Sequence, residues 1–596
     1  MPPDGAGGLL HGLFAASFLV TLPALAQEPP ARDTTTGPAT QVLAGPALLP
    51  TFPTNIPTGP LPPGARYVFT RDSILWSSSQ SLADLLGRIP GVYIARGGFL
   101  GLPEYVSYAG RGAAAVEVYW DGLPLAPLGG DTVHLDLGTF PLTYLQRVDV
   151  HVLPATLRIF LTSERHETRE PRSLIRVMSG SFKTAAYTAL FQQRWPSGLG
   201  ANLAAHFGGT DGASGENRSD QAFDAWVRME WLPRATAGAS YQVRRQTYDR
   251  DAVLTGRSPV AVSPRIPARH GTRSDYLLDV FLATRPDGLG WRVQAGLGSS
   301  AWTSDSVIAD QRLRQAYLGL GYRGSALAAE VRGRVADART TSTLEGRLAW
   351  TPTTGIVLAA DGRHRRHTGD RSSTDLHATA AMWKGPVALV GTIAKSSAVQ
   401  APVLPADTAQ ESLDKSLRLS LSTRPLAASI GLVERDTYEP LPFSELPVVP
   451  AFGPSVKGTW LVVEGQVQPW KPLTLSGWHQ RARDAAAADF QPPSMSRVQL
   501  TFRSKFWRTF RSGAFDLKVQ FALESWEDGA AGRTSSGAPI PLEGVTYQEW
   551  LVTFQIMDFT AFWDLRDAAL VQKQYVPGLS FPHNAQVFGV RWEFRN

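Results

Sequence analysis

SLADLLGRIPGVYI (residues 81–94) is the stretch that decides the fold of this 596-residue chain, together with YWDGLPL (residues 119–125) downstream. Ser81 stands at a helix N-cap position, and Asp84 adds an acidic group to the first turn. The leucines that follow Ser81 fall on one face of the helix that it starts. Pro90-Gly91 ends this helix, and the next residues, VYI, begin a strand.

Three more short strands are predicted near this helix. Tyr67–Thr70, Val116–Trp120 and Arg147–Val152 are apolar runs of strand length, and Asp121-Gly122 makes a turn after the second of them. Together with the helix, these strands predict a small α+β domain over residues 67–165.

The start of the chain reads as an export signal. Leu9–Leu22 supplies an apolar core, and Ala24-Leu25-Ala26 is a small-residue cleavage site, although no Lys or Arg precedes the core. We therefore expect residues 1–26 to be a signal peptide. Residues 27–66 are rich in Pro and Thr, which favours an extended or disordered periplasmic linker.

Residues 166–596 carry a pattern of period two. Along 223–231, 498–506 and 515–524, apolar side chains alternate with polar ones, which places one face of each strand in an apolar medium. About 22 such segments are long enough for a tilted membrane crossing. Short turns alternate with long loops between them, an asymmetry that a soluble β-sandwich or propeller does not need. The last strand, with aromatic residues up to Phe594, fits the same pattern.

The predicted fold is therefore an all-β transmembrane barrel of about 22 antiparallel strands, with a small N-terminal α+β plug domain inside its lumen. The barrel takes residues 166–596 and the plug takes residues 67–165.

Composition excludes several other classes. Apolar residues make up 43% of the chain and charged residues 18%, which excludes a disordered protein. The chain has no Cys, so disulfides, thiol catalysis and Cys-ligated metal centres are impossible. The net charge of +6 is small and its basic residues are scattered, which disfavours a nucleic-acid partner. We find no phosphate-binding loop and no catalytic, cofactor or metal constellation, and we expect no enzyme.

Several motifs resemble, in order, those of the TonB-dependent outer-membrane receptors. They are SLADLLGRIPGVYI (81–94), VSYAGRG (106–112), VEVYWDGLPL (116–125), LQRVDVHVLPA (145–155) and a closing stretch within residues 572–594. The resemblance places the plug signature at Leu85, Pro90, Gly91, Arg111, Gly112, Asp121 and Gly122.

The resemblance implies energised uptake, across the cell outer membrane, of a scarce and bulky ligand of the siderophore, corrinoid, haem or glycan class. The implied partners are an inner-membrane TonB energy-coupling complex, outer-membrane lipids, the barrel-assembly machinery and the unknown small ligand. The alternative is a receptor-like channel or surface-binding protein of the same architecture without energised transport.

Two features depart from the family pattern. The best candidate for an energy-coupling box is TQVLA, formed by Thr40, Gln41, Val42, Leu43 and Ala44. It is an extended apolar pentamer and a weak match. The glycine-rich run that usually ends the plug is absent from residues 156–171. This absence leaves open whether the last plug strand is shorter or differently seated.

Some charged residues can be interpreted in two ways. Arg111 and Asp121 either pair with lumen charges and set the force that moves the plug, or Asp121-Gly122 is only a hairpin turn. His364–His367 is a basic cluster that we expect at a solvated rim rather than at a metal site. Glu164–Glu170 is expected to be a charged hinge between plug and barrel, solvated or facing the lumen, and not a catalytic group.

Overall fold

The computed structural model describes residues 49–53, 64–212, 220–253, 266–304, 310–483, 488–566, 573–581 and 584–595. The described residues belong to one compact unit, Leu48–Asn596. The predicted signal peptide and the TQVLA pentamer lie outside them. No helix in the described part of the chain is long and apolar enough to cross a membrane.

The plug is a mixed α+β domain, as the sequence predicts. Its main sheet has the strand order β1-β6-β7-β4-β5, in which β4 and β7 run parallel and the other pairs are antiparallel. A second pair, β2 and β3, forms a separate hairpin. The elements are β1 (Arg66–Thr70), α2 (Arg71–Leu75), α3 (Leu82–Leu86), β2 (Tyr93–Arg96), β3 (Glu104–Ser107), η2 (Gly112–Ala115), β4 (Val116–Trp120), β5 (Leu123–Pro124), η3 (Leu137–Thr139), β6 (Leu145–Val152) and β7 (Leu157–Ser163).

Helix α3 follows from its local chemistry. The Ser81 hydroxyl accepts a hydrogen bond from the backbone N–H of Asp84 at 3.2 Å, which is the predicted N-cap. The α3 leucines are fully buried and join the plug core. The helix ends early, at Gly87, so Pro90 and Gly91 belong to the connection that leads to β2.

The last plug strand is fully formed without the glycine run. All seven residues of β7 are buried, and the strand lies between β4 and β6 in the centre of the sheet. Its residues LRIFLTS provide the β-branched and apolar side chains that a doubly covered strand requires.

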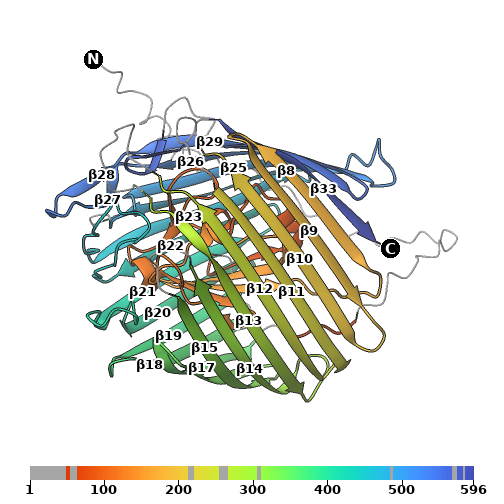
Figure 1. Ribbon diagram of the computed structural model, residues 1–596, viewed down its shortest axis with the longest axis horizontal. Helices are drawn as coiled ribbons and strands as arrows, with labels where there is room; N and C mark the ends of the chain where they lie inside the picture. Colours follow the sequence, from red (N-terminus) through yellow and green to blue (C-terminus); the bar gives the residue numbers. More distant parts are fainter. Residues whose placement is uncertain are drawn as a thin grey trace. The chain divides into compact units, whose positions relative to one another are not determined.

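A closed antiparallel barrel of 22 strands forms the rest of the described chain, which confirms the predicted fold class (Figure 1). Its strands are β8 (Arg172–Gly180), β9 (Thr184–Arg194), β10 (Leu199–Thr210), β11 (Asp220–Arg234), β12 (Ala237–Arg250), β13 (Arg269–Ala283), β14 (Gly290–Thr303), β15 (Gln311–Arg323), β16 (Leu327–Ala336), β17 (Thr340–Thr353), β18 (Ile356–His367), β19 (Ser372–Lys384), β20 (Val387–Ala398), β21 (Gln410–Ser422), β22 (Leu426–Arg435), β23 (Gly458–Trp470), β24 (Leu473–Ala482), β25 (Ser494–Ser504), β26 (Phe515–Trp526), β29 (Val545–Ile556), β30 (Phe559–Arg566) and β33 (Ala585–Arg595). The last strand, β33, pairs with the first, β8, and closes the barrel.

The barrel wall follows the predicted alternation. On β11, Trp231 is 54% exposed on the outer face, whereas Arg228 is 1% exposed on the lumen side. The outer aliphatic and aromatic side chains suit a lipid medium, and the inner polar ones face the plug.

The predicted alternation of short turns and long loops holds in part, because residues 181–183, 337–339 and 368–371 make short turns on the rim that carries the long loops. The chain crosses from β9 to β10 and from β13 to β14 in a few residues, at what we term the short-turn rim. The opposite, long-loop rim carries residues 399–409 and 436–457. Two long loops contain hairpins of their own, β27 (Gly529–Arg533) with β28 (Pro539–Leu542), and β31 (Lys573–Val576) with β32 (Leu579–Phe581).

Residues 49–53 depart from the expected extended linker. Phe52 is buried against Leu232 and Phe281 on the barrel wall, and its ring meets that of Phe281 edge to face at 4.8 Å. The backbone N–H of Leu49 donates to the carbonyl of Glu167 at 2.7 Å. An aromatic residue in a Pro-rich stretch thus docks this segment.

Candidate functional site

Buried charges join the plug to the barrel wall. Asp121, at the turn between β4 and β5, pairs with Arg228 of β11 at 3.0 Å and with Arg165 at 3.2 Å. It also accepts hydrogen bonds from Ser163 Oγ at 2.5 Å and from Gln242 Nε2 at 2.9 Å. Burial alone would raise the pKa of Asp121, but the two guanidinium groups outweigh burial and hold the pKa below its ordinary value. Asp121 is therefore both a turn residue and a plug–barrel ion pair.

Arg111 forms a second connection. Its guanidinium pairs with Asp414 of β21 at 2.5 Å, donates to Ser412 Oγ at 2.8 Å and stacks 4.8 Å from the ring centroid of Tyr438. Arg111 is 3% exposed, so this pair is shielded from water. The role of both residues in plug movement stays a prediction.

A larger ion network crosses from the plug sheet to β18 and β19. Glu117 of β4 pairs with Arg158 of β7 at 3.0 Å and with Arg363 of β18. Arg158 pairs in turn with Asp361 of β18 at 2.8 Å. Burial would raise the pKa of Glu117, but Arg363 and Arg158 hold it well below the ordinary value. We refer below to Glu117, Arg158, Asp361 and Arg363 as the charge layer.

The opposite wall has its own network. Asp84 pairs with Arg96 at 2.6 Å and with Arg566 of β30 at 2.9 Å. Here too burial opposes the charge, and Arg566 and Arg96 keep the pKa of Asp84 below its ordinary value. Asp84 therefore has two roles. It stands in the first turn of α3, and it takes part in the buried ion pairs between plug and barrel, which we call the plug seat.

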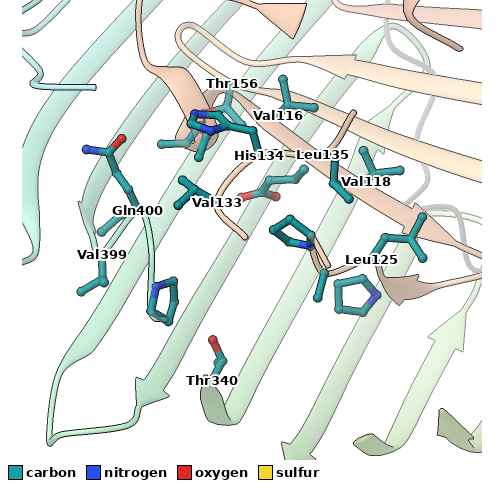
Figure 2. A pocket seen from close by; sticks show the side chains of 18 of the residues that line it. Val116, Val118, Leu125, Val133, His134, Leu135, Thr156, Thr340, Val399 and Gln400 are labelled. Carbon is teal, nitrogen blue, oxygen red and sulfur yellow. Dashed lines mark hydrogen bonds between the residues drawn. The ribbon is translucent and has the colours of Figure 1, made fainter. Parts of the chain in front are cut away.

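An outer cavity of about 250 Å³ lies between the plug and the long-loop side of β15–β21. Figure 2 shows its plug face, with His134 and its two neighbours, and its barrel face, with Thr340, Val399 and Gln400. His134 shares a hydrogen bond between Nδ1 and Asp131 at 3.3 Å, and its buried Nε2 has no hydrogen-bond partner in the described part of the chain. The lining is mixed, with apolar side chains beside arginines and carboxylates.

Two arginines of the outer cavity carry positive charge without an ion-pair partner among the described residues. Arg334 donates to Thr343 Oγ1 at 2.9 Å and to Gln315 Oε1 at 3.3 Å. Arg339 donates to the carbonyl of Pro127 at 2.5 Å. Neither has a carboxylate within ion-pair distance in the described ranges, so the cavity presents two cations outside ion pairs to an incoming ligand.

Aromatic rings add to the charges that hold the outer end of the plug. Tyr105 of β3 stacks on Phe443 of the long loop 436–457, with centroids 4.5 Å apart and planes 5° apart. Tyr93 of β2 packs against Phe490 and Trp526. Long loops therefore lie directly on the plug hairpin, and the outer cavity opens beside this aromatic cluster.

The remaining predicted signature residues serve the plug fold. Leu85 is in the core, and Gly91, Gly112 and Gly122 adopt positive φ angles that favour glycine. The cluster His364–His367 divides between the two faces of β18, as alternation requires, with His364 exposed and His367 buried. In the expected hinge, Glu164, Arg165 and His166 are buried.

Sequence reasoning missed Glu117, Arg158 and the charges they meet. Their signal was a charged residue inside each of two apolar plug strands, VEVYW and LRIFLTS, where an unpaired charge is costly. The described residues contain no group of three or more His, Asp or Glu that could hold a metal ion.

Comparison with known proteins identifies the plug. Residues 62–159 match the family described as TonB-dependent Receptor Plug Domain. Three similar solved structures are a ferric enterobactin receptor variant of Pseudomonas aeruginosa, PfeA, in complex with enterobactin (11% identity, TM-score 0.65, covering 89% of this chain and 99% of that chain), the siderophore receptor PirA of Acinetobacter baumannii (11%, 0.66, 89% and 98%) and the FrpB iron transporter of Neisseria meningitidis (8%, 0.67, 89% and 99%). At these identities the structural likeness shows the fold alone.

Proposed function

We propose that this chain, which has the plug domain and closed barrel of the TonB-dependent receptors, is an outer-membrane receptor that binds a scarce ligand at its outer cavity and imports it. The lipid-type outer face of the barrel and the plugged lumen support this proposal. The similar solved structures are named as receptors and as a transporter, which also supports the proposal.

The observation that carries the proposal is the presence in the outer cavity of two cations outside ion pairs, Arg334 and Arg339. A cavity of this kind favours an anionic ligand with several oxygen acceptors. The similar structures are named as receptors for ferric enterobactin and for siderophores and as an iron transporter. We therefore propose an anionic iron chelate as the ligand, ahead of corrinoid, haem and glycan ligands.

Growth of a gene-deletion strain tests this choice. Loss of growth on iron chelates, with unchanged growth on corrinoid, haem and glycan sources, is the expected result. The variant Arg334→Gln/Arg339→Gln should weaken chelate binding by at least about tenfold for each charged hydrogen bond lost. The control Arg285→Gln/Arg424→Gln removes two exposed charges at the short-turn rim and should bind normally. Equal chelate binding by both variants would rule out the outer cavity as the ligand-binding site.

Energy coupling is tested at the N-terminal segment. We propose that an inner-membrane TonB complex binds residues before 49, with TQVLA as the candidate box. Removing residues 27–48 keeps the docked Phe52 segment, so the barrel entrance is preserved. Uptake should be abolished while ligand binding persists. Uptake at the original rate would instead indicate a channel or surface-binding protein without energised transport.

A further inference from the structure

Two cavities lie along the same part of the barrel wall. The outer cavity contacts β15–β20 on the long-loop side. An inner cavity of about 400 Å³ contacts the same strands on the other side, where Gly288 and Arg323 of the short-turn rim line it. Each is many times larger than the ~10–15 Å³ that holds one water molecule.

The charge layer stands between these cavities where their linings meet, beside a second contact in which Glu345 of the outer lining pairs with Arg347 of the inner lining at 3.4 Å. Glu117 lines the outer cavity and Arg158 lines the inner one, and the two side chains pair at 3.0 Å. On the barrel side, Asp361 lines the inner cavity and His377 the outer one, and they lie 3.1 Å apart. Paired side chains of the plug, β18 and β19 thus form the floor of the outer cavity and the roof of the inner one.

The plug contributes its half of the layer from adjacent strands. Glu117 of β4 and Arg158 of β7 are register partners in the parallel part of the plug sheet. They therefore project from one face, side by side, toward β18. Beyond the layer, the inner cavity has a mixed lining, in which Thr379 and Thr392 on neighbouring strands share a hydrogen bond at 3.1 Å.

We propose that the two cavities are halves of one path for small hydrophilic solutes, which the charge layer interrupts while the plug stays in the barrel. This inference goes beyond the proposed function, because the path requires neither a particular ligand nor energy coupling. Separation of the Glu117 and Arg158 side chains from β18 joins the cavities, and the rest of the plug seat remains in place.

The variant Glu117→Ala/Arg158→Ala tests the layer without changing net charge. It removes both plug side chains and leaves the barrel groups paired, since Arg363 keeps Asp375 at 2.8 Å and Asp361 keeps His377. The matched control is Asp136→Ala/Arg269→Ala. It removes another buried plug–barrel pair, at 3.0 Å, whose members line neither cavity.

The conductance of the purified full-length protein in planar lipid bilayers shows whether this path is open. We expect a severalfold rise over the wild-type protein for Glu117→Ala/Arg158→Ala, and wild-type conductance for the control. A folded barrel, verified by circular dichroism, without increased conductance would overturn the proposal. An equal rise in the control would also overturn it, because a loosened plug would then explain both results.

A thiol reagent shows which part of the lumen the conducted ions cross. The natural chain has no Cys, so an introduced one is the only reactive thiol. In the Glu117→Ala/Arg158→Ala background, Thr392→Cys places a thiol in the inner cavity, and Ser240→Cys places one on β12 away from both cavities. A bulky thiol reagent should block conductance for Thr392→Cys only. Block at Ser240→Cys, or no block at Thr392→Cys, would refute the path.

Discussion

Replacing Asp121 by Asn removes one buried charge from the plug seat and leaves the local turn intact. Asn is favoured at the positive φ of this hairpin turn, 46° for Asp121, and its amide oxygen still accepts from Gln242. Arg228 keeps Glu230 at 2.5 Å, but Arg165 loses its only carboxylate partner in the described part of the chain. An uncompensated buried charge of this kind costs about 3–5 kcal/mol.

Hydrogen–deuterium exchange of the β4 and β7 peptides measures this cost. If the plug opens locally before exchange, about 3–5 kcal/mol corresponds to roughly a hundredfold to several-thousandfold faster exchange in the variant. The control Asp211→Asn breaks an exposed pair with Lys183 on the long-loop rim and should leave plug exchange unchanged. Less than a tenfold change in Asp121→Asn, with a folded barrel, would refute the view that this ion pair seats the plug.

Three other outcomes follow from the same contacts. Arg111→Ala should speed plug exchange and alter ligand uptake, because Asp414 loses its guanidinium partner; unchanged values of both would exclude a role for Arg111 in the plug seat. Folding lowers the pKa of Asp121, so its contribution to plug stability is present above its unfolded pKa of about 3.9 and is lost as the pH falls through the folded value. When hydrogen–deuterium exchange is measured over a series of pH values, the difference between wild type and Asp121→Asn should therefore vanish in acid. Phe52→Ala should release residues 49–53 to limited proteolysis while the barrel strands stay protected.

The barrel was predictable from sequence because its surroundings impose a simple rule. Lipid on one side and a polar lumen on the other require alternation at every second residue, and each strand repeats this rule independently. The plug helix was predictable for a local reason as well, since the Ser81 cap and the following leucines lie within a few residues. Both signals are short in range, so a single sequence contains them completely.

The plug seat was not predictable, since its partners are distant in sequence. Glu117 meets Arg363 and Arg111 meets Asp414, and no spacing rule links residues so far apart. The lumen contains many other charges of both signs, so the pairing depends on how the plug is oriented in the barrel. The docking of Phe52 was missed for a related reason, because composition described its segment as a linker and one aromatic residue carried the contact.

The distribution of these contacts bears on how a solute crosses the barrel. Complete withdrawal of the plug breaks buried ion pairs on β11, β13, β18, β21 and β30, and also separates Tyr105 from the ring of Phe443. Each barrel charge that withdrawal leaves buried without a partner costs about 3–5 kcal/mol until water reaches it. Opening the charge layer separates the plug from β18 alone, and the aromatic cluster stays packed. A small displacement along β15–β20 is therefore the less costly route, and it is the route that the two cavities already follow on either side of the layer.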